Sequence, residues 1–131
     1  MKKIYRLNEL NDLELDIKSP SIIFLKGDLW AWKTTLAKHI FSNLLHIKDE
    51  IKSPTYVYYN KYGNNYHFDL YRLTNSSEFF AIWWEEILDN NAWVILIEWP
   101  EIIEDRYNAD IIIKLTKTDN EDEREIEIIW L

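Results

Sequence analysis

Hydrophobic residues along this chain fall into short continuous runs and into one long run with helical spacing. Ser21–Gly27 (SIIFLKG) and Val94–Glu98 (VILIE) are continuous apolar runs, which are typical of strands buried in a parallel sheet. In Thr34–Leu45 leucine and isoleucine recur at helical spacing, which predicts a helix. The pattern therefore predicts strand–helix–strand units around a buried sheet.

Aromatic and β-branched residues flank two polar turns, and this arrangement predicts two antiparallel hairpins. Near the N-terminus a short strand is expected, followed by a helical segment that Asn8 or Asn11 caps and that ends near Lys18. The remaining expected elements are a strand at Ile4–Leu7, a hairpin of Thr55–Tyr62 with Tyr66–Tyr71 around Gly63, Asn64 and Asn65, a helix from Ser76 or Ser77 to about Leu88, and a closing hairpin of Asp110–Lys117 with Arg124–Trp130.

Together these elements predict an α/β fold of the P-loop NTPase type, with three layers in which helices flank a central mixed β-sheet. The length of 131 residues suits a single domain over residues 1–131, and the hydrophobic fraction of 47% argues against disorder. No apolar run reaches about 18 residues, and the N-terminus lacks the apolar core of a signal peptide, so no membrane contact is expected.

Composition narrows the chemistry further. Without cysteine the chain forms no disulfide, zinc–thiolate site or catalytic thiol, which is compatible with the expected cytoplasmic location. The 15 basic and 23 acidic residues give a net charge of -8, which disfavours nonspecific binding to nucleic-acid phosphates. Any contact with RNA would therefore require a local basic site or a partner protein.

A phosphate-binding loop motif, G-x-x-x-x-G-K-[ST], is almost complete between the first buried strand and the following helix. Gly27, Lys33 and Thr34 occupy motif positions, but Trp32 replaces the second glycine. Such a loop binds phosphates through backbone N–H groups and the lysine, and its hydroxyl binds Mg2+. The alternative is an ordinary strand–loop–helix connection with a surface lysine, and Trp32 gives that alternative more weight.

Two acidic residues on strands are candidates for metal or water chemistry. Asp69 lies in HFDLYR and Glu98 in LIEWP. An acid at the carboxyl end of a buried strand beside a phosphate-binding loop can hold Mg2+ or polarise the attacking water. Asp69 could instead pair with Arg72. Glu98 could instead be a capped strand end, but its apolar run implies deep burial, so its charge requires a partner.

Three further residues have two interpretations each. Thr55 in KSPTY is a candidate switch hydroxyl for the metal or the γ-phosphate, with a simple turn as the alternative. His67 is interpreted as a packed, hydrogen-bonded histidine rather than a catalytic one. Arg124 could reach back to a nucleotide, although the acidic stretch around it is most simply a solvated turn.

Four motifs in a fixed order carry a resemblance to a known family. They are GDLxAxKTT, KSPTY, HFDLYRL and LIEWPE, with an SSEFF…EE helix before the last, and they span about Ile22 to Glu101. In this order they resemble the TsaE (YjeE) family, the small P-loop ATPase of bacterial tRNA threonylcarbamoyladenosine synthesis. The resemblance implies an ATPase that uses ATP and Mg2+, binds a TsaB–TsaD heterodimer, and through that complex supports threonylcarbamoylation of adenosine 37 in tRNA.

The resemblance also assigns roles to residues. It implies that Lys33 contacts phosphates, that Thr34 binds Mg2+, and that Glu98 is the other metal-linked acid. Lys33, Asp69 and Glu98 form the implied catalytic set, and Thr34, Asp69 and Glu98 the implied metal set. The implied nucleotide-binding set is Gly27, Asp28, Leu29, Trp30, Ala31, Trp32, Lys33, Thr34, Thr35, Thr55, Asp69, Trp99 and Arg124.

Tryptophan stands where this family has glycine. The family's loop reads GDLGAGKTT where this chain has Trp30 and Trp32, and the family also favours glycine or a small residue at Trp83 and Trp93. The chain has 2 glycines, where average usage predicts about nine, and 7 tryptophans. Either the loop has decayed, or the gene decodes UGA as glycine and was translated with UGA as tryptophan. The second explanation accounts better for the intact Lys33 and acids.

Three functions remain in comparison. The first is the ATPase subunit of the tRNA-modifying complex, and the second is a nonhydrolysing scaffold of the same fold with a tryptophan-blocked loop. The third is a P-loop kinase for a small metabolite, against which the chain lacks a lid-like arginine cluster.

Overall fold

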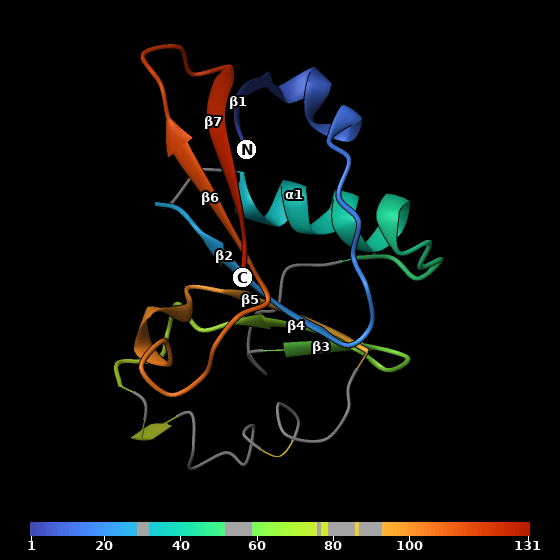
Figure 1. Cartoon of the computed structure of the whole chain (residues 1–131), viewed down its shortest axis with the longest axis vertical. Helices are drawn as coiled ribbons and strands as arrows, with labels where there is room; N and C mark the ends of the chain where they lie inside the picture. Colours follow the sequence, from blue (N-terminus) through green and yellow to red (C-terminus); the bar gives the residue numbers. More distant parts are fainter. Residues whose placement is uncertain (29–31, 52–58, 76, 79–85, 87–92) are drawn as a thin grey trace.

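The computed structural model describes residues 1–28, 32–51, 59–75, 77–78, 86 and 93–131. The described strands form one seven-stranded sheet, so the predicted α/β fold with a central mixed sheet is confirmed (Figure 1). In spatial order the strands are β1 (Lys2–Arg6), β7 (Glu123–Trp130), β6 (Ile111–Lys117), β2 (Ser21–Lys26), β5 (Val94–Glu98), β4 (Asn65–Asp69) and β3 (Tyr59–Tyr62).

The centre of the sheet is parallel and both of its edges are antiparallel. Strands β6, β2, β5 and β4 are paired in parallel, whereas β1 with β7, β7 with β6, and β4 with β3 are antiparallel. The carboxyl ends of parallel strands meet at one edge of a sheet, and here the register pairs Glu98 with both Leu25 and Asp69. The loop after β2 therefore starts beside the two acids.

Helix α1 (Lys33–His39) and the π-helical turn η2 (Ile40–Leu44) cover one face of the sheet (Figure 1). Leu36 and Phe41 are fully buried, because helical periodicity brings them to the side that faces the strands. They share a hydrophobic cluster with Leu25 of β2. The helix predicted over Thr34–Leu45 is thus confirmed in position and in the face that it buries.

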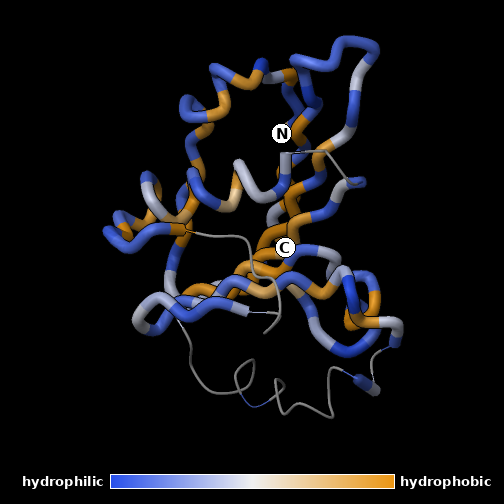
Figure 2. Tube along the Cα trace, turned by 180° about the vertical axis from the view of Figure 1, so that it is seen from behind, coloured by the Kyte–Doolittle hydropathy of each residue, from blue (hydrophilic) through white to orange (hydrophobic). Residues whose placement is uncertain are grey.

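The opposite face of the sheet has its own hydrophobic cluster. Phe24, Phe68 and Ile97 belong to it, because successive side chains of a strand point to opposite faces. Ile103, which follows the 3-10 turn η3 (Pro100–Ile102), packs into the same cluster. Figure 2 shows hydrophobic residues along the central strands and hydrophilic residues along the outer turns.

The segment after the first strand differs from the sequence-based expectation. The strand is Lys2–Arg6 rather than Ile4–Leu7, and the helix expected to end near Lys18 is a 3-10 turn, η1 (Leu7–Asp12). Beyond that turn Leu13 and Leu15 are buried while Glu14 between them is exposed. Burial at every second residue is the pattern of an extended chain. The helical segment is therefore shorter than expected and gives way to extended chain at Leu13.

The two predicted hairpins are present, with shifted bounds for the first. Strands β3 and β4 meet at Gly63, whose φ of 62° suits the turn. Residues 55–58 of this predicted hairpin, including Thr55, lie outside the described residues, as does most of the helix expected to run to Leu88. The closing hairpin of β6 and β7 matches its predicted bounds within two residues.

Replacement of a buried isoleucine in the central strand should destabilise the fold. Ile23 is 0% exposed in β2, so Ile23→Ala should lower the free energy of unfolding by about 2–5 kcal/mol through lost burial and a cavity. Ile4 is 52% exposed, so Ile4→Ala should change it by less than about 1 kcal/mol. Urea denaturation of both variants measures the difference, and equal losses would contradict the assignment of β2 to the core.

Candidate functional site

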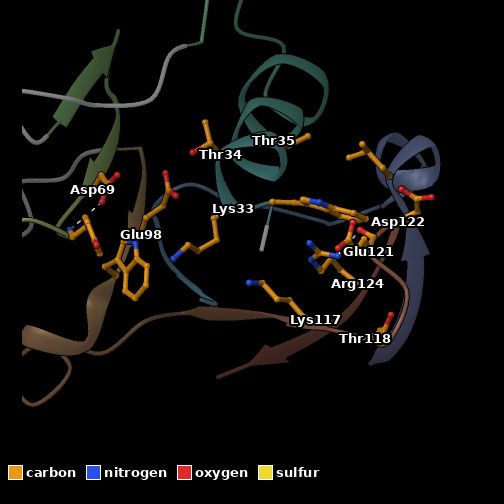
Figure 3. A pocket seen from close by; sticks show the side chains of 14 residues that line it. Lys33, Thr34, Thr35, Asp69, Glu98, Lys117, Thr118, Glu121, Asp122 and Arg124 are labelled. Atoms are coloured by element: carbon orange, nitrogen blue, oxygen red, sulfur yellow. Dashed lines mark hydrogen bonds between the residues drawn. The ribbon is translucent and has the colours of Figure 1, made fainter. Parts of the chain in front are cut away.

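A cavity of about 820 Å3 opens at the carboxyl edge of the parallel strands (Figure 3). In Figure 3, Lys33 lies between Asp69 and Glu98 on one side and Arg124 with Lys117 on the other. The lining residues are Leu7, Trp32, Lys33, Thr34, Thr35, Asp69, Tyr71, Glu98, Trp99, Lys117, Thr118, Glu121, Asp122 and Arg124.

The cavity brings together most of the residues that the sequence singled out. Asp28 is exposed and does not line it, and Gly27 contributes its carbonyl group to Lys33. The expected loop residues Leu29, Trp30 and Ala31 and the expected switch residue Thr55 lie outside the described part of the chain.

Sequence reasoning missed the far wall of the cavity. Lys117, Thr118 and Asp122 come from the end of β6 and from the turn that follows it. They reach the loop because β6 pairs with β2, and no local motif reports such a long-range pairing. The predicted closing hairpin, with Arg124 on it, was the signal in the sequence that residues near 120 could approach the loop before Lys33.

Lys33, the first residue of α1, is buried among aromatic and acidic groups. Its Nζ donates a hydrogen bond of 2.5 Å to the carbonyl oxygen of Gly27 and lies 3.2 Å from the ring centroid of Trp99. Burial lowers the pKa of this amine, and the charges of Glu98 and Asp69 oppose that shift. The cation–π contact and the carbonyl oxygen therefore fix the position of the lysine amine beside the first turn of α1.

Glu98 ends β5 with only 2% of its surface exposed, and it has the partner that its burial requires. Nε2 of His67 lies 2.6 Å from Oε2 of Glu98, and His67 is 0% exposed. The register pairs Asp69 with Glu98, so His67, two residues earlier, points to the same face. The interpretation of His67 as a packed, hydrogen-bonded residue is confirmed, but the sequence did not identify Glu98 as its partner.

Asp69 ends β4 beside Glu98. Its Oδ1 accepts a hydrogen bond of 3.0 Å from the backbone N–H of Tyr71. Burial raises the pKa of the Asp69 carboxyl, and the nearby charge of Glu98 raises it further, whereas the Tyr71 N–H, His67 and Lys33 act in the opposite direction. Because each carboxyl group disfavours the charged form of the other, a cation bound between Asp69 and Glu98 would stabilise both in their ionised form.

Trp32 occupies the second glycine position of the loop motif with a left-handed backbone, at φ 70° and ψ 22°. Glycine adopts this conformation freely, whereas a residue with a Cβ adopts it at a cost of about 1–2 kcal/mol. Its indole lines the cavity, and the guanidinium carbon of Arg124 lies 4.2 Å from the ring centroid. The backbone thus has the form that suits glycine, while the side chain occupies part of the site.

Arg124, on β7, lines the same cavity as Lys33. Its Nη1 donates hydrogen bonds to the carbonyl oxygens of Glu121 and Glu123, at 2.8 and 2.7 Å. These bonds to its own hairpin hold the guanidinium group over Trp32. The arrangement places a cation on the side of Lys33 that is opposite the acids, as Figure 3 shows.

Trp99 and Trp93 can be compared with Trp32 in backbone conformation. Trp99 also has a left-handed backbone, at φ 56°, so a positive φ alone does not identify a glycine position. Trp93 does not have a positive φ, is 55% exposed, and precedes β5 at the end away from the cavity. The backbone therefore favours glycine at position 32 but makes no such demand at position 93.

The donors in the cavity suit Mg2+ only in combination with phosphate. Within the described ranges, no group of three or more histidine, aspartate or glutamate side chains is arranged to hold a metal ion. Mg2+ usually keeps several waters and takes one or two carboxylates together with substrate phosphates. Asp69, Glu98 and the hydroxyl of Thr34 line one cavity and meet that description.

Among the described residues, no helix is long and apolar enough to cross a bilayer.

The fold and the cavity define the class of protein: an α/β domain of the P-loop type, with the motif lysine beside two strand-end acids. A family model described as "Threonylcarbamoyl adenosine biosynthesis protein TsaE" matches residues 4–126. The chain therefore belongs to the TsaE family, which confirms the resemblance that its motifs indicated.

Curated relatives support the same assignment. The protein named tRNA threonylcarbamoyladenosine biosynthesis protein TsaE of Rickettsia prowazekii is 34% identical over 110 residues, which cover 80% of this chain and 75% of the relative. The protein of the same name from Haemophilus influenzae is 34% identical over 125 residues, covering 89% and 75%. The crystal structure of Bacillus subtilis YdiB is similar in fold, with a TM-score of 0.67 at 24% identity, covering 96% of this chain and 83% of that one.

Replacement of Asp69 by asparagine should change how stability depends on pH. Burial raises the pKa of this carboxyl in the folded state, so its contribution to stability is full below the unfolded-state pKa and is lost as pH rises through the folded-state pKa. Asparagine does not ionise, so the stability of Asp69→Asn relative to the parent should rise as pH increases from about 4, the ordinary pKa of aspartate, through the raised folded-state pKa. Urea denaturation across this range measures the gain, and a difference that does not change with pH would contradict the shift.

Proposed function

We propose that this chain is the subunit that binds and hydrolyses ATP for the threonylcarbamoylation of adenosine 37 in tRNA, in concert with a TsaB–TsaD heterodimer. The observation that carries the proposal is the convergence of Lys33, Asp69 and Glu98 in one cavity of a TsaE-family chain. The names of the curated relatives support the pathway.

Five polar residues of the cavity have a role in this proposal. Lys33 binds the phosphates. To reach them, its amine would leave its present partners, the Gly27 carbonyl and the Trp99 ring. Thr34, Asp69 and Glu98 hold Mg2+, which when bound neutralises the charge of the phosphates. Glu98 also orients the attacking water through a carboxylate oxygen. Arg124, on the opposite wall, contacts the nucleotide from the side of the closing hairpin.

The charge of the chain favours a protein partner over a direct contact with RNA. The net charge of -8 repels nucleic-acid phosphates, and direct binding would require a concentrated basic patch. The proposed subunit therefore acts on tRNA through the TsaB–TsaD pair. ATP hydrolysis would reset that complex, and the transfer of the threonylcarbamoyl group would take place elsewhere.

One observation favours a second candidate, a nonhydrolysing scaffold of the same fold. The indole of Trp32 lies inside the cavity with Arg124 stacked on it, where the motif requires open space against the backbone. A chain with tryptophan at this position would bind nucleotide weakly. ATP hydrolysis measured with and without the TsaB–TsaD pair separates the two candidates, because the scaffold hydrolyses none in either condition.

Restoration of both loop glycines should restore nucleotide binding. Trp30→Gly combined with Trp32→Gly removes the indole from the cavity and relaxes the left-handed backbone at residue 32. The Kd for Mg·ATP, measured by calorimetry, should fall at least about tenfold, which corresponds to about 1.4 kcal/mol. Adding Lys33→Ala to this double variant should weaken binding about 10- to 100-fold, because a charge-assisted hydrogen bond is lost.

Trp93→Gly is the matched control for this experiment. It makes the same substitution at an exposed tryptophan outside the cavity, so the affinity for Mg·ATP should not change. Unchanged affinity in the double loop variant would count against the proposed site. Tight binding by the unaltered chain would show that Trp32 does not block the loop.

The codons of the tryptophans should distinguish decoding from decay. If UGA is read as glycine, codons 30, 32, 83 and 93 are UGA, whereas codon 99, which belongs to the family's EWP motif, is UGG. The left-handed backbone at Trp32 fits this expectation, because glycine is the residue that adopts it freely. DNA sequencing of the gene gives the answer, and UGG at codon 30 or 32 would leave the scaffold as the function of the chain.

A further inference from the structure

His67 does not line the cavity itself, but it contacts Glu98, which does. Its ring is 0% exposed and its Nε2 lies 2.6 Å from Oε2 of Glu98. Among the described residues, Nδ1 is buried without a hydrogen-bond partner. A histidine kept in the core at the cost of one unsatisfied nitrogen has a reason to be there beyond packing.

The proton between the two side chains can be assigned from their chemistry. An ionised carboxylate only accepts hydrogen bonds, so Nε2 carries the hydrogen and donates it to Oε2 of Glu98. The same donor is present whether the ring is neutral or charged. The bond therefore commits one of the two carboxylate oxygens of Glu98 to His67 and leaves Oε1 for the cavity.

Packing fixes the direction of this donor. The ring of Phe41, in η2, has its centroid 5.6 Å from that of His67, and Phe41 in turn lies 5.6 Å from the ring of Tyr62 in β3. All three side chains are buried. The imidazole is thus held between the helical layer and the sheet, and a rigid donor of this kind orients the carboxylate that accepts from it.

We propose that His67 is a positioning residue for Glu98: it holds one carboxylate oxygen so that the other faces the cation or the water of the cavity. This proposal rests on the proposed function and deepens it, because it states how the acid at the end of β5 is aimed. Removal of such an orienting partner typically costs about 10- to 100-fold in metal affinity or activity.

Two substitutions separate orientation from packing, and both are made in the Trp30→Gly, Trp32→Gly background. His67→Phe keeps a buried ring but has no donor, and it should lower kcat or raise the Mg2+ concentration for half-maximal ATP hydrolysis about 10- to 100-fold, with little change in the KM for ATP. His67→Gln keeps an N–H group near the position of Nε2 and should recover most of the loss.

His39→Phe is the matched control. His39 is a second buried histidine, whose Nε2 and Nδ1 lie 2.9 Å from the Leu13 carbonyl oxygen and from Asn43, and it does not line the cavity. This variant should lower the Tm without changing the Mg2+ dependence. If His67→Phe does the same, or if His67→Gln fails to recover activity while it remains folded, the proposal is wrong.

A double-mutant cycle tests whether His67 acts through Glu98. In a Glu98→Gln background, His67→Phe should cause no further loss of Mg2+-dependent nucleotide binding, because the group that it orients is already altered. A further loss equal to that in the parent would show that His67 acts independently of Glu98.

Nitrogen NMR of the unaltered chain tests the bond without any nucleotide. The His67 ring should show a protonated Nε2 whose shift changes in Glu98→Gln, and an unprotonated Nε2 would overturn the assignment. If the loop variant binds no Mg·ATP, the proposed function fails together with the role toward the cation. The NMR result then decides separately whether His67 orients Glu98.

Discussion

The rest of the site depends on how the buried charge of Glu98 is compensated. A carboxylate out of contact with water loses several kcal/mol of hydration unless protein groups replace it. His67 donates to one oxygen, and the charge of Lys33 attracts the group through space. His67 comes from β4 and Lys33 from the start of α1, which follows β2, and β5 lies between these two strands in the sheet.

The sequence predicted those elements of the fold that depend on the spacing of hydrophobic residues within one short segment. Continuous apolar runs predicted β2 and β5, and helical spacing predicted α1 with its buried face. The helix expected to end near Lys18 failed because alternation at Leu13 and Leu15 specifies an extended chain. Local pattern reading weighed the capping residues there and overlooked the period of two.

The candidate site was predictable on one side and not on the other. Lys33, Asp69 and Glu98 stand in motifs, so their chemistry could be read from the sequence and the structure brings them together. Lys117 and Thr118 carry no motif, and their place on the far wall follows from the pairing of β6 with β2, more than eighty residues apart in the chain. The bond from His67 to Glu98 likewise depends on the register of two strands.

The pairing of β7 has a consequence for how the protein is made. Strand β7 follows every other described strand in the chain, yet it pairs with β1, the first, and carries Arg124 into the cavity. A growing chain that has been synthesised as far as β5 already contains Lys33, Asp69 and Glu98 but not Arg124. Contacts of such long sequence separation form slowly. During translation, therefore, the part of the cavity that Lys33, Asp69 and Glu98 line can form before β7 is synthesised. The part that Arg124 lines forms only after β7 has been synthesised and has paired with β1.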